Sequence, residues 1–309
     1  MSKVIYYLKA TRPRTLLLAI SSIFMGITLP YADYTNYAPD WKLVVLLFLT
    51  ACFLQILSNV ANELGDFRMG TDTAPGRFGP GYSLASGALE EKDFKIMIII
   101  YMVLSAVCGL GVIWFAFGTF WDYGAFIFLL GGFVAIKAAT GYSLGLDNYG
   151  RRGLGDLYVF LFFGIIAVVG SYLLCAKELP GWYIILPAVA VGCFNTAVLN
   201  INNIRDIESD QEIRNTIPVR FGEKKAKIYH VALILVGWAC MLGFSAVVQN
   251  RFQIHSFFNY FYLISLPLFI YGAVQVCRLD HSKLDKYLPL MVVSTALFCF
   301  LAGLGYIFL

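Results

Sequence analysis

The sequence predicts an all-α membrane protein: a multi-span bundle of about nine transmembrane helices around a central cavity, with a parallel four-helix internal repeat. Three observations predict it. The chain of 309 residues is 59% hydrophobic and only 14% charged, whereas soluble domains average about 25% charged residues. Its apolar residues fall into runs long enough to cross a bilayer. Two similar acidic segments follow two of these runs.

The apolar runs define the predicted spans, since a spanning helix needs about 20 mainly apolar residues. The run at 122–141 is the least regular, because Lys137 lies near its end. The basic start of the chain lacks the apolar core and small-residue cleavage site of a signal peptide, so we expect no cleavable signal. The nine predicted spans are 15–33, 42–62, 94–117, 122–141, 156–176, 182–203, 226–248, 256–277 and 287–308.

Basic residues predict the orientation. With nine spans, all but three of the 23 Lys and Arg residues lie on the side of the N-terminus, and the exceptions are Lys42, Lys177 and Arg251. The positive-inside rule then places the N-terminus and the long loops in the cytoplasm. This asymmetry accounts for the net charge of +4, which therefore requires no nucleic-acid partner. Membrane lipid is the surrounding partner that we expect.

Two acidic motifs repeat across the chain. The first reads NELGDFRMGTDTAPGRFG at 62–79, and the second reads NNIRDIESDQEIRNTIPVRFG at 202–222. Each starts with Asn, has Asp four residues later, carries a further Asp and closes on RFG. Four spans separate them, and an even number preserves direction, so we expect a parallel repeat whose motifs open on one face. We predict a single domain at 1–309, with pseudo-repeats at about 1–141 and 142–280 and an extra ninth span.

The spacing within each motif predicts where its side chains lie. Asn202, Asp206 and Asp210 are four residues apart and should share one face of a helix. In the first motif Asn62 and Asp66 fit this row, but the next position is Gly70. Asp72 must therefore come from a turn beyond the helix, which a glycine permits.

Carboxylates at the edge of a bilayer are costly unless they are paired, hydrated or bound to metal. Two facing acidic clusters suit Mg²⁺, which takes one or two carboxylates and completes its shell with water and substrate phosphates. Arginines between the acids can hold the remaining phosphate oxygens. The pattern therefore favours a Mg²⁺-bound diphosphate carried on a hydrocarbon tail, whose carbon becomes cationic as diphosphate leaves. A plain solvated acidic face is the alternative, and the repeat argues against it.

The segments NELGDFRMGTD and NNIRDIESD resemble the paired Asp-rich motifs of the UbiA superfamily of intramembrane aromatic prenyltransferases. The resemblance covers nearly the whole chain, and KATRPRTLLLA at 9–19 resembles that family's N-terminal segment. The segments YGRRGLGDLYVFLFFGIIAVVG at 149–170 and RNTIPVRFGEKKA at 214–226 resemble the menaquinone-pathway branch, which prenylates 1,4-dihydroxy-2-naphthoate. One position departs from the family: Glu63 stands where Asp is usual.

The resemblance implies a Mg²⁺-dependent transfer of a polyprenyl chain from polyprenyl diphosphate to 1,4-dihydroxy-2-naphthoate. The acceptor would lose CO₂, giving demethylmenaquinone, in the inner membrane of a bacterium. Matching positions make Asn62, Asp66, Asp72, Asn202, Asp206 and Asp210 the metal–diphosphate residues. Glu63 has a longer side chain than the usual Asp and can still reach the metal or a phosphate-binding cation.

The glycine-rich loop at 140–156 is a flexible connection or a lid. In the second case its arginines attract the anionic substrates, and a tyrosine faces the cation. Asp156 could be a helix cap or a catalytic group, and Arg12 and Arg14 could set topology or bind substrate. The predicted catalytic residues are Asn62, Asp66, Asp206, Tyr142 and Tyr149; the predicted substrate-binding residues are Arg14, Arg68, Arg77, Arg151, Arg152, Asn202, Arg205 and Arg220; and the predicted metal ligands are Glu63, Asp66, Asp72, Asp206 and Asp210.

Rival functions stay open at this point. The motifs bind the diphosphate, so they do not distinguish naphthoate from 4-hydroxybenzoate or homogentisate as acceptor. A cation transporter also carries intramembrane acids and repeats, although the acids here cluster at one end of the helices. Phosphatidyl-alcohol transfer would require one denser motif instead of two matched ones.

Overall fold

The computed structural model describes residues 3–34, 36–70, 83–144, 149–211, 213–253 and 255–309. Within this part of the chain every regular element is a helix, and nine helical segments are long and apolar enough to cross a membrane. The predicted fold class is confirmed, including the least regular span, which forms the helix Tyr123–Gly141.

The first half contains α1 (Lys3–Ala10), α2 (Pro13–Thr28), η1 (Leu29–Ala32), α3 (Trp41–Arg68), α4 (Glu91–Phe117) and α5 (Tyr123–Gly141). The next part contains α6 (Gly155–Val159), η3 (Phe160–Val169), α7 (Gly170–Ala176), η4 (Trp182–Ile184), α8 (Ile185–Arg205), α9 (Ile207–Asp210) and α10 (Ile217–Phe221). The last part contains α11 (Glu223–Phe252), η5 (Phe257–Ser265), α12 (Leu266–Arg278), η6 (His281–Lys283), η7 (Asp285–Tyr287) and α13 (Leu288–Ile307).

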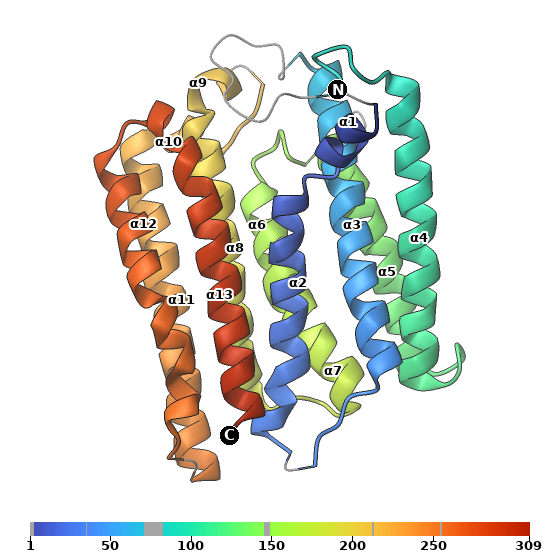
Figure 1. Ribbon diagram of the computed structural model, residues 1–309, viewed down its shortest axis with the longest axis vertical. Helices are drawn as coiled ribbons and strands as arrows, with labels where there is room; N and C mark the ends of the chain where they lie inside the picture. The colour runs from blue at the N-terminus through green and yellow to red at the C-terminus, as the bar shows by residue number, and fades with distance from the viewer. Residues whose placement is uncertain (1–2, 35, 71–82, 145–148, 212, 254) are drawn as a thin grey trace.

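Local sequence signals explain where several helices begin. The fourth helix starts at Glu91, three residues before the predicted span, because Glu90 and Asp93 form a reciprocal capping box. In the first span, Arg12 adopts a left-handed backbone and Pro13 opens α2, so α1 forms a separate short helix at the end of the bundle (Figure 1). Asp93 accepts a hydrogen bond from the Tyr7 hydroxyl at 2.8 Å and thereby ties α1 to α4.

The fifth span is one continuous run through α6, η3 and α7, and its middle section, Phe160–Val169, is wound as a π-helix. It packs very closely against the sixth span. A Cβ atom built on Gly164 would lie 2.6 Å from the carbonyl oxygen of Ala188 and 2.6 Å from the Cα of Gly192. Glycine at this crossing therefore lets the two backbones touch.

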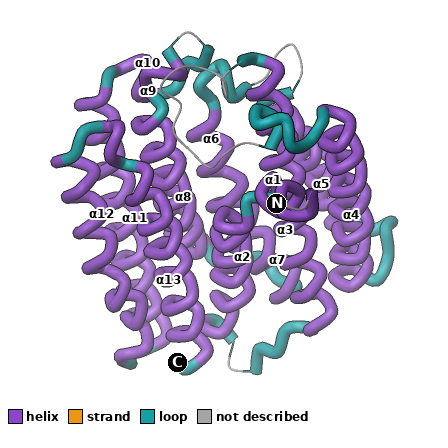
Figure 2. Tube along the Cα trace, turned by 45° about the horizontal axis from the view of Figure 1, so that its top comes forward, coloured by secondary structure: helices purple, strands orange, loops and turns teal. Residues whose placement is uncertain are grey.

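The helices form an upright bundle whose loops gather at its two ends (Figures 1 and 2). The helix α3 packs along α4 and α8 packs along α11, so each helix that ends in an acidic motif lies against the next span. The core around α8 is aromatic, and Phe194 contacts Phe269 and Phe298 with ring centroids 4.5 and 4.9 Å apart.

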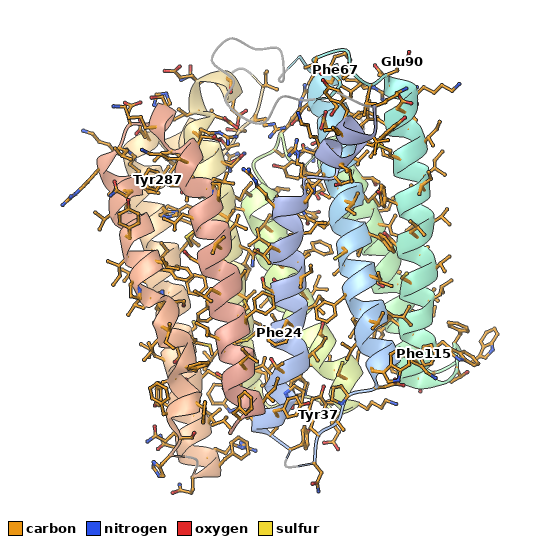
Figure 3. The ribbon with its side chains drawn as sticks, viewed as in Figure 1. Phe24, Tyr37, Phe67, Glu90, Phe115 and Tyr287 are labelled. Atoms are coloured by element: carbon orange, nitrogen blue, oxygen red, sulfur yellow. The ribbon has the colours of Figure 1, made fainter. Side chains whose placement is uncertain are left out.

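The two ends of the bundle differ in chemistry. Phe67 and Glu90 lie at the end that carries the acidic motifs, whereas Tyr37 and Phe115 lie at the opposite end (Figure 3). At that opposite end, Asp33 accepts hydrogen bonds from the hydroxyls of Tyr172 and Tyr183 at 2.5 and 2.8 Å. Each carboxylate oxygen of Asp33 thus accepts a hydrogen bond from a tyrosine, and Asp33 lies at the end of the bundle opposite the acidic motifs.

Candidate functional site

The two acidic motifs meet at one end of the bundle. Asp66 lies in the last turns of α3, and it forms an ion pair with Arg214, 148 residues further along the chain. Both side chains are buried, with 1% and 5% of their surface exposed. The amide of Arg214 donates to the carbonyl of Asp210 at 2.8 Å. The ion pair therefore joins the first motif to the end of the second.

The second motif keeps the predicted row of polar side chains. The helix α8 ends at Arg205 and α9 begins at Ile207, with Asp206 between them at φ −94° and ψ 14°. Backbone bonds nevertheless continue from Asp206 to Asn202 at 3.1 Å and from Asp210 to Asp206 at 3.0 Å. The interruption is thus a single residue, and the four-residue spacing is retained across it.

Arg205 is held by the protein on several sides. Its Nε and Nη2 atoms donate to the two carboxylate oxygens of Asp206, both at 2.8 Å. Nη2 also donates to Asn202 at 2.8 Å, and Nη1 donates to Asp285 at 2.7 Å. Only 4% of the side chain is exposed. Arg205 therefore orients Asp206 and fixes the second motif to the start of the last span.

The other predicted arginines lie near the surface. Arg68 pairs with Glu91 of α4, with its Nη2 and Nε atoms 2.6 and 3.0 Å from one carboxylate oxygen. The remaining described arginines of the predicted substrate site are exposed, namely Arg14, Arg151, Arg152 and Arg220. Arg77 and Asp72 lie outside the described residues. The structure thus brings Arg214, and not Arg68, against the first motif.

Glu63 is buried, and its carboxylate accepts hydrogen bonds from the backbone amides of Ser83 and Leu84 at 2.6 and 3.3 Å. In this arrangement Glu63 fixes the point at which the chain returns after the first motif. Helix α3 ends at Arg68, and Gly70 has a φ of +75°. The predicted turn at Gly70 is therefore confirmed.

The loop after the fourth span packs on both motifs. The Ser143 hydroxyl donates to the side-chain oxygen of Asn62. On the other side, the Asn215 amide donates to the carbonyl of Arg151 at 3.0 Å. Gly153 has a φ of +77°, and a Cβ there would lie 2.2 Å from the Asn215 carbonyl oxygen. Only glycine allows the loop to lie this close to the second motif.

Aromatic rings line the space beside the ion pair. The Arg214 guanidinium lies 5.9 Å from the centre of the Tyr142 ring. Tyr142 contacts Tyr149 edge-on at 5.4 Å, and Tyr149 stacks on Tyr158 at 3.8 Å. The Tyr149 hydroxyl donates to the carbonyl of Ala138. This column of tyrosines leads from the acidic motifs into the fifth span.

The charges of the site perturb one another. Burial alone would lower the pKa of Arg214, but Asp66, Tyr142 and Asp210 outweigh it, so the pKa is raised well above its usual value. Arg214 is therefore always cationic. Among the described motif residues, the buried ionisable side chains are four carboxyl groups, Glu63, Asp66, Asp206 and Asp210, and two guanidiniums, Arg205 and Arg214. This oxygen-rich, acidic donor set fits a divalent cation such as Mg²⁺.

Sequence reasoning missed Arg214 as a site residue. The signal was present, because Arg214 stands four residues after Asp210 and extends the row of Asn202, Asp206 and Asp210 by one step. Ser143 and Asp285 were also missed, and the local sequence around either residue gives no such signal.

Comparison with known proteins agrees with this architecture. The chain is 38% identical over 300 residues to a 1,4-dihydroxy-2-naphthoate octaprenyltransferase of Haemophilus influenzae, covering 96% of this chain and 94% of the relative. It is 41% identical over 280 residues to the Escherichia coli protein of the same name, covering 90% and 87%.

A solved UbiA homologue from Archaeoglobus fulgidus, bound to GPP and Mg²⁺, has the same fold. It superposes with a TM-score of 0.64 at 18% identity, covering 98% of this chain and 100% of that one. The family model described as UbiA prenyltransferase family matches residues 19–298. With nine apolar helices in the part of it that the structure describes, two converging acidic motifs and these relatives, the chain belongs to the UbiA prenyltransferase family, as a multi-pass integral membrane protein.

Proposed function

We propose that this protein transfers a polyprenyl chain from polyprenyl diphosphate to 1,4-dihydroxy-2-naphthoate, with release of CO₂. The product is demethylmenaquinone, released in its reduced form because the transfer itself is redox-neutral. The observation that carries the proposal is the buried Asp66–Arg214 ion pair, which joins two distant acidic motifs into one site. The two bacterial relatives named for this reaction support the choice of acceptor.

The acidic side chains hold the diphosphate end of the substrate. Asp66, Asp206 and Asp210 bind Mg²⁺ in this proposal, together with Asp72, which lies outside the described residues. When bound, Mg²⁺ would neutralise charge that develops on the diphosphate as it leaves. The surplus of buried carboxylates over guanidiniums supports this assignment. Asn62 and Asn202 stand one helical turn before Asp66 and Asp206, and we place them beside the same diphosphate. Glu63 supports the first motif through its hydrogen bond with the backbone amide of Ser83.

Cationic side chains divide into an inner and an outer set. Arg214 is the inner cation, because it is buried between Asp66 and the Tyr142 ring. We assign to it the phosphate contact that the sequence suggested for Arg68. Arg205 acts through Asp206, which it orients by two hydrogen bonds. The exposed arginines attract the two anionic substrates toward the site; they are Arg14, Arg151, Arg152 and Arg220.

The tyrosine column supplies the apolar side of the site. Tyr142 and Tyr149 present aromatic faces beside Arg214 and the first motif. Such faces stabilise positive charge on a substrate carbon and exclude water from it. The loop at 149–154 covers this region, since it is fixed to Asn215 of the second motif.

Orientation and organisation complete the proposal. We propose that the acidic end and the N-terminus face the cytoplasm, in the inner membrane of a bacterium, and the strong excess of Lys and Arg at that end supports this orientation. The chain is one domain of 1–309 built from two parallel repeats, about 1–141 and 142–280, with a ninth span. The equivalent packing of α3 on α4 and of α8 on α11 supports the repeat.

The test is an acceptor assay. Membranes that contain the protein are incubated with labelled prenyl diphosphate, Mg²⁺ and each of 1,4-dihydroxy-2-naphthoate, 4-hydroxybenzoate and homogentisate. We expect a labelled product with naphthoate alone, loss of turnover with EDTA and recovery with added Mg²⁺. Transfer to hydroxybenzoate but not to naphthoate would reject the proposed acceptor.

A further inference from the structure

Asp156 is a buried carboxylate that has no role in the transfer reaction as proposed above. It is the second residue of α6, and 8% of its surface is exposed. Its Oδ1 atom is buried and accepts no hydrogen bond from any described residue. The N-cap of α6 is Leu154, and no side chain caps this helix. Asp156 is therefore not the helix cap that the sequence left open as its role.

An unsatisfied carboxylate oxygen is costly at this depth. Leaving a buried acceptor without a donor costs about 1–3 kcal/mol, and ionisable residues inside spans are rare unless they have a function. Among the described residues, Asp66 and Asp206 have arginine partners, whereas no ion pair to Asp156 is formed. Asp66 and Asp206 are thus held by guanidiniums, whereas the buried Oδ1 of Asp156 can still take a hydrogen-bond donor from a substrate.

The helical turn that carries Asp156 lies beside the site, against the ring of Tyr142. A Cβ atom on the preceding Gly155 would lie 3.3 Å from the Tyr142 hydroxyl oxygen. Tyr142 in turn lies against the Arg214 guanidinium. The Thr196 hydroxyl donates to the Asp156 carbonyl at 3.5 Å, which connects this turn to α8. The turn that carries Asp156 thus packs on Tyr142, the same residue whose ring lies near Arg214.

Electrostatics place Asp156 in the same environment. The pKa of Tyr142 is raised mainly by burial; Arg214 opposes the rise, and the negative charges of Asp66, Asp156 and Asp210 add to it. All of these charges therefore act on one phenol. The geometry alone assigns Asp156 to the tyrosine side, and the pKa of Tyr142 agrees.

We propose that Asp156 is the catalytic residue that takes the proton from a ring hydroxyl of the aromatic acceptor, an inference that rests on the proposed function. The buried Oδ1 receives this hydroxyl as its missing hydrogen-bond donor. The position and the chemistry of Asp156 both favour contact with the aromatic acceptor over contact with the diphosphate, because an unpaired carboxylate repels a phosphate and attracts a hydroxyl.

The step balances without an added reactant. The hydroxyl O–H bond breaks, its proton moves to Asp156, and the oxygen becomes a carbonyl. The ortho carbon that bears the carboxylate bonds to the prenyl carbon, whose bond to the diphosphate oxygen breaks with the electron pair leaving on the diphosphate. The bond to the carboxylate then breaks as CO₂ leaves, its electron pair returns to the ring, and the carbonyl oxygen regains the proton from Asp156.

The experiment uses the full-length protein in detergent with Mg²⁺. Asp156→Asn, Asp156→Glu and Asp156→Ala are compared with Asp33→Asn, a matched removal of a carboxylate at the opposite end of the bundle. Size-exclusion profiles report folding, binding of an unreactive prenyl thiodiphosphate reports the donor site, and kcat and KM are measured for 1,4-dihydroxy-2-naphthoate. Formate is added to Asp156→Ala as a substitute carboxylate.

We expect Asp156→Asn to lower kcat by about 10²–10⁴-fold, the usual contribution of a general base, with binding of the thiodiphosphate unchanged. Asp156→Glu should keep part of the activity, formate should restore part of it to Asp156→Ala, and Asp33→Asn should match the wild type. Near-normal turnover of Asp156→Asn overturns the proposal. So does the absence of formate rescue together with an inactive Asp156→Glu variant. A wild type that does not prenylate naphthoate refutes the proposed function instead.

Discussion

The ion pair between Asp66 and Arg214 makes a strong prediction about stability. Replacing Arg214 with Met keeps a long side chain but removes the charge that faces Asp66. Both groups are almost completely buried, with 1% and 5% exposed, so solvent screens the pair very little. Removing one partner of a buried pair costs about 3–5 kcal/mol, because the other charge loses its compensation.

The expected effect is large enough to measure by melting. For a chain of this length, each kcal/mol in the free energy of unfolding shifts the melting temperature by roughly 2 °C. Arg214→Met should therefore melt about 6–10 °C below the wild type. Thermal unfolding of the detergent-purified protein, without substrate, measures this shift. Arg220→Met is the matched control, because Arg220 is an exposed arginine of the same segment and should shift melting by about 1 °C or less.

A double-mutant cycle isolates the pair itself. Asp66→Asn removes the carboxylate, and the double variant Asp66→Asn/Arg214→Met should be less destabilised than the sum of the single variants. A coupling of about 2–3 kcal/mol is expected for a buried contact. The inference that this pair joins the two motifs would be refuted if the destabilisations of the single variants simply added in the double variant. It would also be refuted if Arg214→Met melted at the same temperature as Arg220→Met.

Two further predictions concern turnover. Asp66→Asn and Asp206→Asn should each lower kcat on the order of 10²-fold or more, the usual effect of removing one group that stabilises charge in the transition state. Both variants should still insert in the membrane. Near-normal product formation in both would reject their assignment as metal ligands. Gly153→Ala should raise KM and lower kcat/KM, because a Cβ there would lie 2.2 Å from the Asn215 carbonyl oxygen. Gly118→Ala is its control, since Gly118 has a similar φ of +70° with nothing within 4 Å; equal effects of the two substitutions would contradict a role for the loop contact.

Much of the fold was predictable because its signals are local. An apolar run of about 20 residues forms a spanning helix wherever it occurs, and all nine runs became helices. The boundaries differ where a few residues decide them. At 90–93 a capping box starts the helix before the apolar run begins, and at 12–13 a left-handed arginine and a proline start α2 two residues before the predicted first span.

The candidate site was only partly predictable. The four-residue spacing of the second motif predicted the row of Asn202, Asp206 and Asp210 correctly, because helical hydrogen bonding is local. The same reasoning assigned phosphate oxygens to Arg68, Arg77, Arg205 and Arg220 and left out Arg214. Which arginine lies inside the site depends on how the helices pack. In this packing Arg68 pairs with Glu91 at the surface, whereas Arg214 pairs with the buried Asp66.

By itself, the sequence determined the nine apolar helices found among the described residues and predicted that the two acidic motifs share one end, since hydrophobic length and helical periodicity are properties of short segments. Only the tertiary structure decided that Asp66 meets Arg214, that Arg205 binds Asp285 as well as Asp206, and that Asp156 is buried in a turn that packs on Tyr142. Asp66 and Arg214 are 148 positions apart, and Arg205 reaches Asp285 across 80 positions. Such contacts exist because packing of whole helices, not local propensity, fixes which buried charges face one another.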